Sequence, residues 1–367
     1  MSLTEEIRFK IALTMTPGVG DVAAKNLLSY CGSAEAVFNT PKSKLKNIPG
    51  IGEKTATMIV KKDFFNKVDE ELLFVEKYKI EVLFFLDERF PKRLRECVDS
   101  PILLYYRGNA DLNQHKILGV VGTRNATDYG KAFIKSLMSD LANQDVLILS
   151  GLAYGIDTLA HRGALENGLK TVGVLGHGLN TLYPAQNKAL AKQMIEQGGL
   201  LTELASSSQM LPSNFPQRNR IVAGMCDALL VVESAKKGGA LITANIANSY
   251  NKDVFAVPGN IYDKYSQGCN FLLKTHKAYL VESAEDIVLS MNWANEKVKP
   301  KAQKQLFLNL NTKEKQVVDL LKEHNQLEID VLIKLLNTNN SEYSSTLLEL
   351  ELNGVILSLP GKSYKLA

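Results

Sequence analysis

ILGVVGTRNATDYGKAFIKSLMSDLANQDVLILSG, residues 117–151, is the stretch that decides the fold of this chain. An apolar run ends in glycine, an amphipathic helical pattern follows over 128–143, and a second apolar run again ends in glycine. Continuous apolar runs of this length indicate strands buried on both faces, and a helix between two such strands makes them parallel. The stretch therefore predicts a β-α-β unit.

The same alternation continues along the chain to residue 290. Further strands are predicted at 171–176, 199–203, 228–233, 253–258 and 278–282. Further helices are predicted at 156–167, 185–197, 215–225, 239–251 and 268–276. The alternation predicts an α/β domain with a Rossmann-like, doubly wound parallel sheet. Ligands of such sheets bind at the carboxyl ends of the strands, so the residues that follow each strand are the candidates for a site.

The first strand is followed by Gly122, Thr123 and Arg124. The run is not a GxGxxG, so a dinucleotide fingerprint is absent. Glycine lets the backbone approach a phosphate, threonine offers a hydroxyl, and arginine offers a two-pronged donor. The alternative is that Arg124 pairs with a neighbouring acidic side chain. The position of Arg124 just beyond a strand-end glycine favours an anion site.

Small residues also follow the next two strands. Ser150 and Gly151 fit a turn that exposes backbone N–H groups to an anion. Gly176 and Gly178 allow a ligand to approach the backbone closely. Lys188, on the helix after the third strand, could reach a phosphate, although a lone helical lysine is more often solvated.

Cations and a glycine pair follow the fourth and fifth strands. Arg218 and Arg220 flank Asn219 at the beginning of a helix, where two guanidinium groups favour an anion. The fifth strand is followed by a glycine turn into another helix, which contains Lys236, Gly238 and Gly239. Several anion sites along one edge of a sheet suit a polymer better than one small ligand.

Catalytic machinery is not evident in the sequence. GEKT at 52–55 lacks the upstream glycine of a Walker loop. Asp157 and His161 lie one helical turn apart, but no Ser or Cys nucleophile stands at a recognisable spacing from them. The four cysteines are scattered and have no metal-ligand spacing. We therefore predict no catalytic residue, no metal, no cofactor and a location in the reducing cytoplasm.

The flanking segments predict two further units. TPGVGDVAAKNLL at 16–28 and IPGIGEKTATMIV at 48–60 repeat a Pro-Gly-x-Gly turn before a helix, which predicts a SAM-like helix-hairpin-helix domain over 1–65. Such hairpins either hold a DNA phosphate through backbone amides or serve only for packing. The end of the chain, 309–367, predicts three helices and a two-strand ribbon, a winged-helix domain. Between these units lie the Rossmann-like domain, 66–293, and a basic linker, 294–308.

Charge is small overall and uneven along the chain. The 43 Lys and Arg and the 39 Asp and Glu give a formal net charge of +4, which neither diagnoses nor excludes nucleic-acid binding. The winged-helix segment has more acids than lysines, and its candidate recognition helix carries Glu342, Glu349 and Glu351. This composition suits a contact with protein better than a contact with phosphate. No apolar stretch of about 18 residues predicts a membrane span.

Eight motifs occur in the central domain in this order: VVGTR, SGLAYGIDTLAH, TVGVLGHGLNTLYPAQN, LLTE, FPQRNRIVAG, GALITANIA, FAVPGN and QGCNFLL. Together they resemble the bacterial DNA-processing protein A family, also called DprA or Smf. The resemblance covers residues 80–290, and the two flanking units match the three-part layout that is commonest in the family.

The resemblance implies a protein that binds single-stranded DNA, protects incoming strands during natural transformation and loads the RecA recombinase onto them. It also implies a homodimer formed through the Rossmann-like domain. The family's Gly-x-Arg element, which contacts DNA phosphate, falls on Gly122 and Arg124, and its Arg-Asn-Arg element falls on 218–220. Lys188 and Lys236 are candidates for the family's lysine contacts. Where the family often has Ser-Gly-Ser, this chain has Lys-Gly-Gly, which removes hydroxyl donors.

The alternative hypothesis is an enzyme, a Rossmann-type nucleotide or phosphoribosyl hydrolase. Hydrolases that resemble this architecture carry a PGGxGTxxE motif, and the nearest run here is KKGGALITA, which ends without an acid. The missing glutamate argues against hydrolysis. A non-enzymatic mediator that binds single-stranded DNA is therefore the favoured hypothesis.

Overall fold

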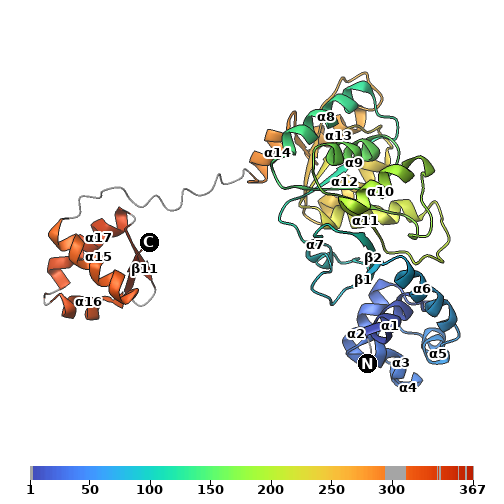
Figure 1. Ribbon diagram of the computed structural model, residues 1–367, viewed down its shortest axis with the longest axis horizontal. Helices are drawn as coiled ribbons and strands as arrows, with labels where there is room; N and C mark the ends of the chain where they lie inside the picture. The colour runs from blue at the N-terminus through green and yellow to red at the C-terminus, as the bar shows by residue number, and fades with distance from the viewer. Residues whose placement is uncertain are drawn as a thin grey trace. The chain divides into compact units, whose positions relative to one another are not determined.

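The computed structural model describes most of the chain, which divides into two compact units, Met1–Ala294 and Asn295–Ala367 (Figure 1). The described residues are 3–293, 311–336, 338, 340–353, 355–359 and 362–366. The predicted basic linker, 294–308, lies outside the described residues. Within the part that is described, no helix is long and apolar enough to cross a membrane.

The larger unit begins with a helical subdomain. Its helices are α1 (Leu3–Met15), α2 (Asp21–Cys31), α3 (Ala34–Asn39), α4 (Lys42–Leu45), α5 (Glu53–Lys61) and α6 (Phe65–Lys77). The turns before α2 and α5 contain Gly18 and Gly50 at φ of 82° and 83°, a conformation that glycine adopts without strain. The Asn26 side chain donates to the Pro49 carbonyl at 3.0 Å, which ties the two predicted hairpins together. Helix α6 packs on α1, so the predicted boundary at 65/66 lies at the start of a helix of this subdomain.

A nine-stranded sheet follows, in the order β1-β2-β6-β5-β4-β3-β7-β8-β9. Its strands are β1 (Glu81–Phe84), β2 (Leu103–Gly108), β3 (Ile117–Val121), β4 (Leu147–Ser150), β5 (Thr171–Val174), β6 (Gly198–Thr202), β7 (Ala228–Val231), β8 (Asp253–Ala256) and β9 (Tyr279–Leu280). Strands β3 to β9 pair in parallel, which confirms the predicted sheet. Strands β1 and β2 extend it antiparallel, because β2 pairs with β6.

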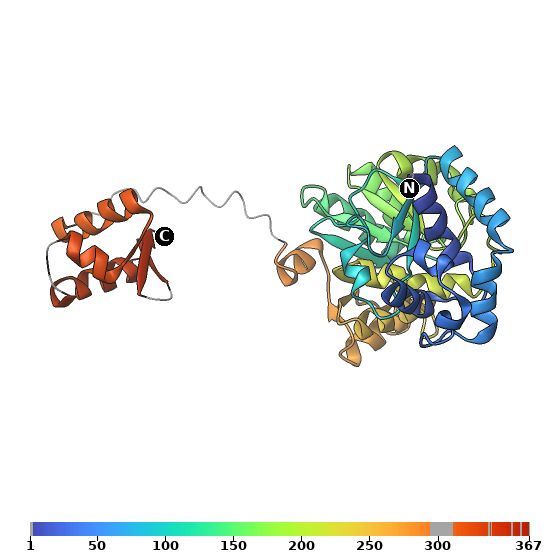
Figure 2. The ribbon, with the colours of Figure 1, turned by 90° about the horizontal axis from the view of Figure 1, so that it is seen from below.

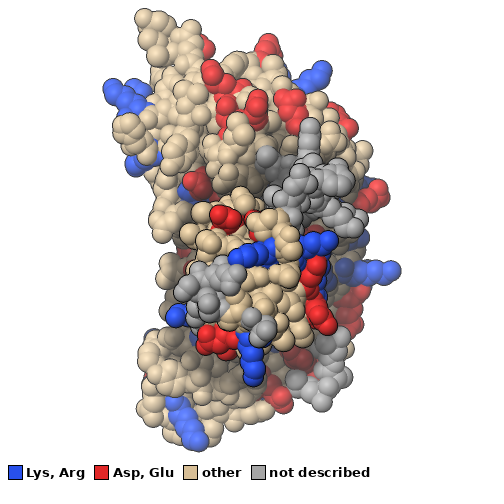
Figure 3. Space-filling model, turned by 90° about the vertical axis from the view of Figure 1, so that its left-hand side faces the viewer, with Lys and Arg blue, Asp and Glu red and all other residues tan. Residues whose placement is uncertain are grey.

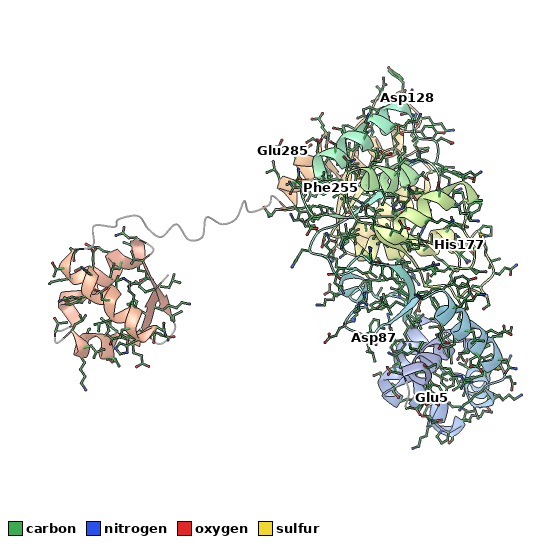
Figure 4. All side chains as sticks on the ribbon, viewed as in Figure 1. Glu5, Asp87, Asp128, His177, Phe255 and Glu285 are labelled. Atoms are coloured by element: carbon green, nitrogen blue, oxygen red, sulfur yellow. The ribbon has the colours of Figure 1, made fainter. Side chains whose placement is uncertain are left out.

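Helices cover both faces of this sheet (Figures 1 and 2). One face carries α8 (Asp128–Leu141), α9 (Ile156–Glu166), α10 (Lys188–Glu196) and α14 (Ala284–Ser290). The other carries α7 (Lys92–Arg95), α11 (Asn214–Met225), α12 (Gly239–Ser249) and α13 (Gln267–Lys274). Alternate residues of each strand supply the two cores: Leu118 packs under α8 and α9, and Ile117 packs under α11. Phe255 of β8 lies among the side chains of this interior (Figure 4).

The chain leaves β3 in one direction through β4, β5 and β6, and then returns to its other side at β7. The connections that follow β3 and β7 therefore diverge onto opposite faces of the sheet. Such a reversal opens a crevice at the carboxyl ends of the two strands, which is where open α/β sheets bind their ligands.

The smaller unit is a winged helix, as predicted. It consists of α15 (Thr312–His324), β10 (Gln326–Glu328), α16 (Ile329–Leu335), α17 (Asn340–Leu352), β11 (Ile356–Leu359) and β12 (Ser363–Leu366), with the sheet order β10-β12-β11. Its core includes Val317, Leu321, Leu332 and Leu350, which are at most 1% exposed.

Candidate nucleic-acid interface

A cleft of about 820 Å³ lies at the carboxyl ends of β3 and β7, where the winding of the sheet reverses. We call it the strand-end cleft. Half of the predicted site residues line it, namely Gly122, Thr123, Arg124, Arg218, Asn219, Gly238 and Gly239. The volume lies within the range of ordinary ligand pockets, about 300 to 1,000 Å³, so the cleft can hold a few nucleotides but not a duplex.

The loop after β3 forms the centre of the strand-end cleft. The Thr123 N–H donates to the Glu233 carbonyl at 2.7 Å, and the Thr123 carbonyl accepts the Ile156 N–H at 3.1 Å. These bonds attach the loop to β7 on one side and to α9 on the other. A Cβ on Gly122 would lie 2.5 Å from the Ile156 side chain, so this glycine is required for packing within the protein.

Arg124 is the exposed cation of the cleft. Its side chain makes no hydrogen bond or ion pair with any residue that the structure describes, so the alternative in which it pairs with a neighbouring acid is not observed. It lies close enough to Arg218 to help lower that residue's pKa. Two cations close together in a cleft attract an anion, and the donors of Arg124 are unpaired among the described residues.

Arg218 occupies a different position from the one expected. It is 5% exposed and donates to the carbonyls of Gly151 and Val174, which end β4 and β5. Burial lowers its pKa to about 10, with Asp157 opposing the shift, so it remains charged at neutral pH. A Cβ on Gly151 would lie 2.4 Å from the guanidinium, so this glycine makes room for Arg218. Arg218 thus forms the floor of the cleft, and much of its hydrogen-bonding capacity is used inside the protein.

Arg220 does not line the strand-end cleft. Its guanidinium pairs with Glu203 at 2.6 Å and with Asp21 at 3.2 Å, and it is only 16% exposed. Residues two apart on an α-helix point in nearly opposite directions, so Arg218 and Arg220 serve different sides of α11. The expectation that both arginines would join one anion site is corrected by this geometry.

The other predicted residues also lie outside the strand-end cleft. Ser150 is buried and donates its hydroxyl to the Val120 carbonyl. A Cβ on Gly176 would meet Phe215 at 3.0 Å, and a Cβ on Gly178 would meet the Ala205 carbonyl at 2.5 Å, so both glycines permit close internal packing. Lys188 and Lys236 are exposed, and neither lines the cleft.

An apolar and aromatic wall also lines the strand-end cleft. Its members are Tyr183, Met210, Pro212, Phe215, Ile242 and Tyr265. The Tyr183 and Phe215 rings pack edge to face with centroids 5.7 Å apart. The position of Phe215 in the sequence, three residues before the Arg-Asn-Arg run, could have indicated that it lines the site. No sequence feature indicates Tyr265, because only the fold brings its hydroxyl within 3.0 Å of the Asn125 side chain.

The candidate catalytic groups are engaged in the interior. His161 Nδ1 lies 2.7 Å from the Thr171 hydroxyl, and burial lowers the pKa of His161 to about 3. Asp157 accepts the Ala153 N–H at 3.2 Å and is not a partner of His161. Burial raises the pKa values of Cys226 and Cys269 to about 12, which keeps both thiols protonated. In the described part of the chain, no group of three His, Cys, Asp or Glu side chains is placed to hold a metal.

Charge on the visible surface is mixed rather than gathered by sign. In Figure 3, blue Lys and Arg side chains alternate with red Asp and Glu side chains. His177, which follows β5, is labelled in Figure 4 and is buried with Nδ1 3.0 Å from the Gly178 carbonyl. With a formal net charge of only +4, the chain has no large excess of positive charge, so an anion in the cleft would be held by individually placed groups such as Arg124.

Family models match all three parts of the chain. The model described as DNA recombination-mediator protein A matches residues 81–292, more than half of the chain. The chain belongs to the DprA family. A SAM-like helix-hairpin-helix tandem matches 10–62, and the DprA winged-helix domain matches 300–362, as the sequence motifs implied.

Relatives in the family support this assignment over most of their length. The DNA processing protein DprA of Streptococcus pneumoniae is 40% identical over 222 residues, which are 60% of this chain and 78% of the relative. Protein Smf of Escherichia coli is 34% identical over 284 residues, which are 76% of this chain and 75% of the relative.

Two solved DprA structures share the fold. The X-ray structure of the Streptococcus pneumoniae protein is 33% identical with a TM-score of 0.67, covering 79% of this chain and 98% of that one. The Helicobacter pylori protein, studied for its unique single-stranded DNA binding mode, is 26% identical with a TM-score of 0.53, covering 58% of this chain and 96% of that one.

Proposed function

We propose that this chain binds single-stranded DNA in the strand-end cleft and acts as a recombination mediator without chemical turnover. In this role it protects incoming DNA in the cytoplasm and loads RecA onto it during natural transformation. The observation that supports the proposal is Arg124, an exposed guanidinium without a partner among the described residues, which lines the same cleft as Tyr183 and Phe215. Phosphate binds the guanidinium, and the unstacked bases of a single strand can contact the aromatic wall.

A single strand fits this site better than a duplex does. In a duplex the bases are paired and stacked, so their faces cannot reach Tyr183 or Phe215. The start of α12 at Gly239 adds backbone N–H groups to the same cleft, and no described side chain caps them. The cleft therefore combines phosphate contacts with base contacts in a channel a few nucleotides long.

Salt-titrated binding of a fluorescent oligothymidylate to the full chain tests the proposal. We expect Arg124→Ala to weaken binding about tenfold or more for all sequences alike. The slope of log affinity against log salt should fall by about 0.7 for each phosphate that the variant no longer neutralises. Arg162→Ala is the matched control, because Arg162 is an exposed arginine on α9 that does not line the cleft.

Two results would contradict the proposal. Equal binding by wild type and Arg124→Ala would move the DNA site elsewhere. Release of free base from nucleoside monophosphates, abolished in Arg124→Ala, would instead support the hydrolase. Against the hydrolase, the buried Ala244 stands where such an enzyme would carry its glutamate.

We place the proposed homodimer interface at the β9 edge of the Rossmann-like sheet. Tyr279 and Leu280 form this edge strand and are 65% and 54% exposed. An unpaired edge with large apolar side chains favours association with a second copy. Light scattering of a Leu280→Lys variant tests this placement: we expect a monomer, and an unchanged mass would exclude this edge.

A further inference from the structure

Two carboxylates of the helical subdomain reach into the Rossmann-like core. Asp21, the first residue of α2, accepts the Ile102 N–H at 3.1 Å and pairs with Arg220 at 3.2 Å. Glu71, on α6, is 2% exposed and accepts the Ser206 N–H with both oxygens at 2.9 Å. The Ser206 hydroxyl donates to the same carboxylate. These contacts join segments that are 81 to 199 residues apart in the sequence.

Two of the residues that receive these contacts, Ser206 and Arg220, belong to or adjoin segment 203–219, which forms one side of the strand-end cleft. We call this segment the 203–219 wall. Ser206 lies in segment 203–213, which connects β6 to α11, and Arg220 lies on α11. The same segment and the first turns of α11 supply the cleft with Met210, Pro212, Phe215 and Asn219. The helical subdomain therefore supports this wall from the side opposite to the cleft.

The charges at this contact depend on one another. Arg220 lies between Glu203 at 2.6 Å, Asp21 at 3.2 Å and Asp99 at 4.0 Å. Burial raises the pKa values of Asp21 and Glu203 even though Arg220 opposes the shift. Removal of Arg220 would leave the carboxylates of Glu203 and Asp21 without their shared counter-charge, which is costly. Such clusters hold a geometry in place more clearly than they add stability.

The hairpins themselves are poorly suited to phosphate. Both hairpin helices begin with an acid: Asp21 starts α2, and Glu53 starts α5. A carboxylate in the first turn interacts favourably with the N-terminal end of the helix dipole, and it repels a second anion there. Glu53 also pairs with Lys42 at 2.6 Å and with Lys46 at 3.2 Å, which occupies the nearest cations.

We propose that the helix-hairpin-helix subdomain is a brace for the single-stranded DNA site, in which Asp21, Glu71 and Arg220 are positioning residues for the wall formed by 203–219. This inference rests on the proposed function of the strand-end cleft. A wall held in one position is ready to receive bases. If the wall is released, only a fraction of the molecules can bind, and the apparent affinity falls by that fraction.

The test compares Asp21→Asn and Glu71→Gln with the control Glu53→Gln in the full chain. Both test variants keep the shape of the side chain and remove its charge, and the control does the same at the exposed start of α5. We expect about tenfold weaker binding of oligothymidylate in the test variants, with an unchanged dependence on salt, because every phosphate contact remains. Glu53→Gln should bind as wild type does.

Hydrogen exchange provides the second measurement. Amides of 203–219 should exchange faster in the two test variants, and those of β4 should keep the protection of wild type. If a variant fails to fold, as loss of β4 protection would reveal, Ser206→Ala replaces it, because it removes one bond to Glu71 and no charge.

Three outcomes would overturn the brace. Two concern the test variants: wild-type affinity although the amides of 203–219 exchange faster, or weaker binding although these amides exchange as in wild type. The third is a smaller salt slope in a further variant, Arg220→Gln, in the same binding assay. The last result would make Arg220 a phosphate contact. If wild type itself fails to bind oligothymidylate, the proposed function fails, and the exchange measurement still decides whether the helical subdomain holds this wall.

Discussion

The strand-end cleft and the outward face of α17 are the two places where this architecture is expected to meet nucleic acid, and their side chains differ. The cleft presents Arg124, which no described side chain pairs, beside an aromatic wall. Helix α17 exposes Leu348 and Leu352, at 57% and 78%, with Glu349 and Glu351 beside them. The sequence has no Lys or Arg from 335 to 361.

The comparison teaches that neither fold nor net charge locates the binding surface. A winged helix is a common DNA-binding fold, yet its recognition helix here offers acids and leucines. The Rossmann-like domain is nearly neutral, yet it places one guanidinium where backbone N–H groups and aromatic rings converge. Function depends on the individual site, and each of the following predictions tests the difference between the two regions.

The largest effect is expected at the floor of the cleft. Arg218→Met should lower the free energy of unfolding of the larger unit by about 3 kcal/mol, because Asp157 loses its buried counter-charge and two carbonyls lose a donor. Urea unfolding followed by fluorescence measures this change. The single tryptophan, Trp293, is 6% exposed in the core of the larger unit, so its signal reports that unit alone. A loss below about 1 kcal/mol would show that Arg218 is not a structural support.

A smaller effect is expected from pH. The pKa of His161 is about 3 in the folded chain and about 6.5 when unfolded, so the unfolded state binds more protons between these values. Stability is then lost as the pH falls below about 6.5, by about 2 kcal/mol at pH 5. In the His161→Gln variant, urea unfolding followed by Trp293 fluorescence should no longer show this loss of stability. An equally steep pH dependence in the variant would assign the effect to other groups.

The smallest effect is expected on α17. The double variant Glu349→Gln, Glu351→Gln should change oligothymidylate affinity less than about twofold and leave the salt slope unaltered, because α17 has no cation to bind phosphate. The salt-titrated assay used for Arg124→Ala provides a direct comparison. Several-fold tighter binding with a steeper salt slope would place α17 next to the DNA, so that the strand-end cleft and α17 would no longer differ in this respect.

Much of the fold could be predicted because its signals are local. The parallel strands were found within a few residues, since continuous apolar runs and helical periodicity reflect burial over short stretches. The antiparallel extension by β1 and β2 was not found, because pairing of β2 with β6 joins residues about a hundred apart. The sequence also predicted a site at the carboxyl ends of the strands, and the structure has a cleft there that Gly122 and Arg124 line.

The roles of the residues within that site could not be predicted in the same way. Gly122 and Gly151 were interpreted as ligand-approach glycines, and the structure shows that they make room for Ile156 and Arg218. A glycine that admits a phosphate and one that admits a neighbouring side chain have the same sequence signature. Only the distance from each position to its neighbours separates the two cases.

The sequence by itself determined the three-part architecture and the family, because periodicity and ordered motifs are properties of the chain alone. Tertiary structure decided which of the predicted arginines is unpaired among the described residues. Arg124, Arg218 and Arg220 have the same side chain. Arg218, however, is buried and donates to two carbonyls, and Arg220 is paired with Glu203. Availability for a ligand depends on the partners that folding brings near, and those partners come from distant parts of the chain.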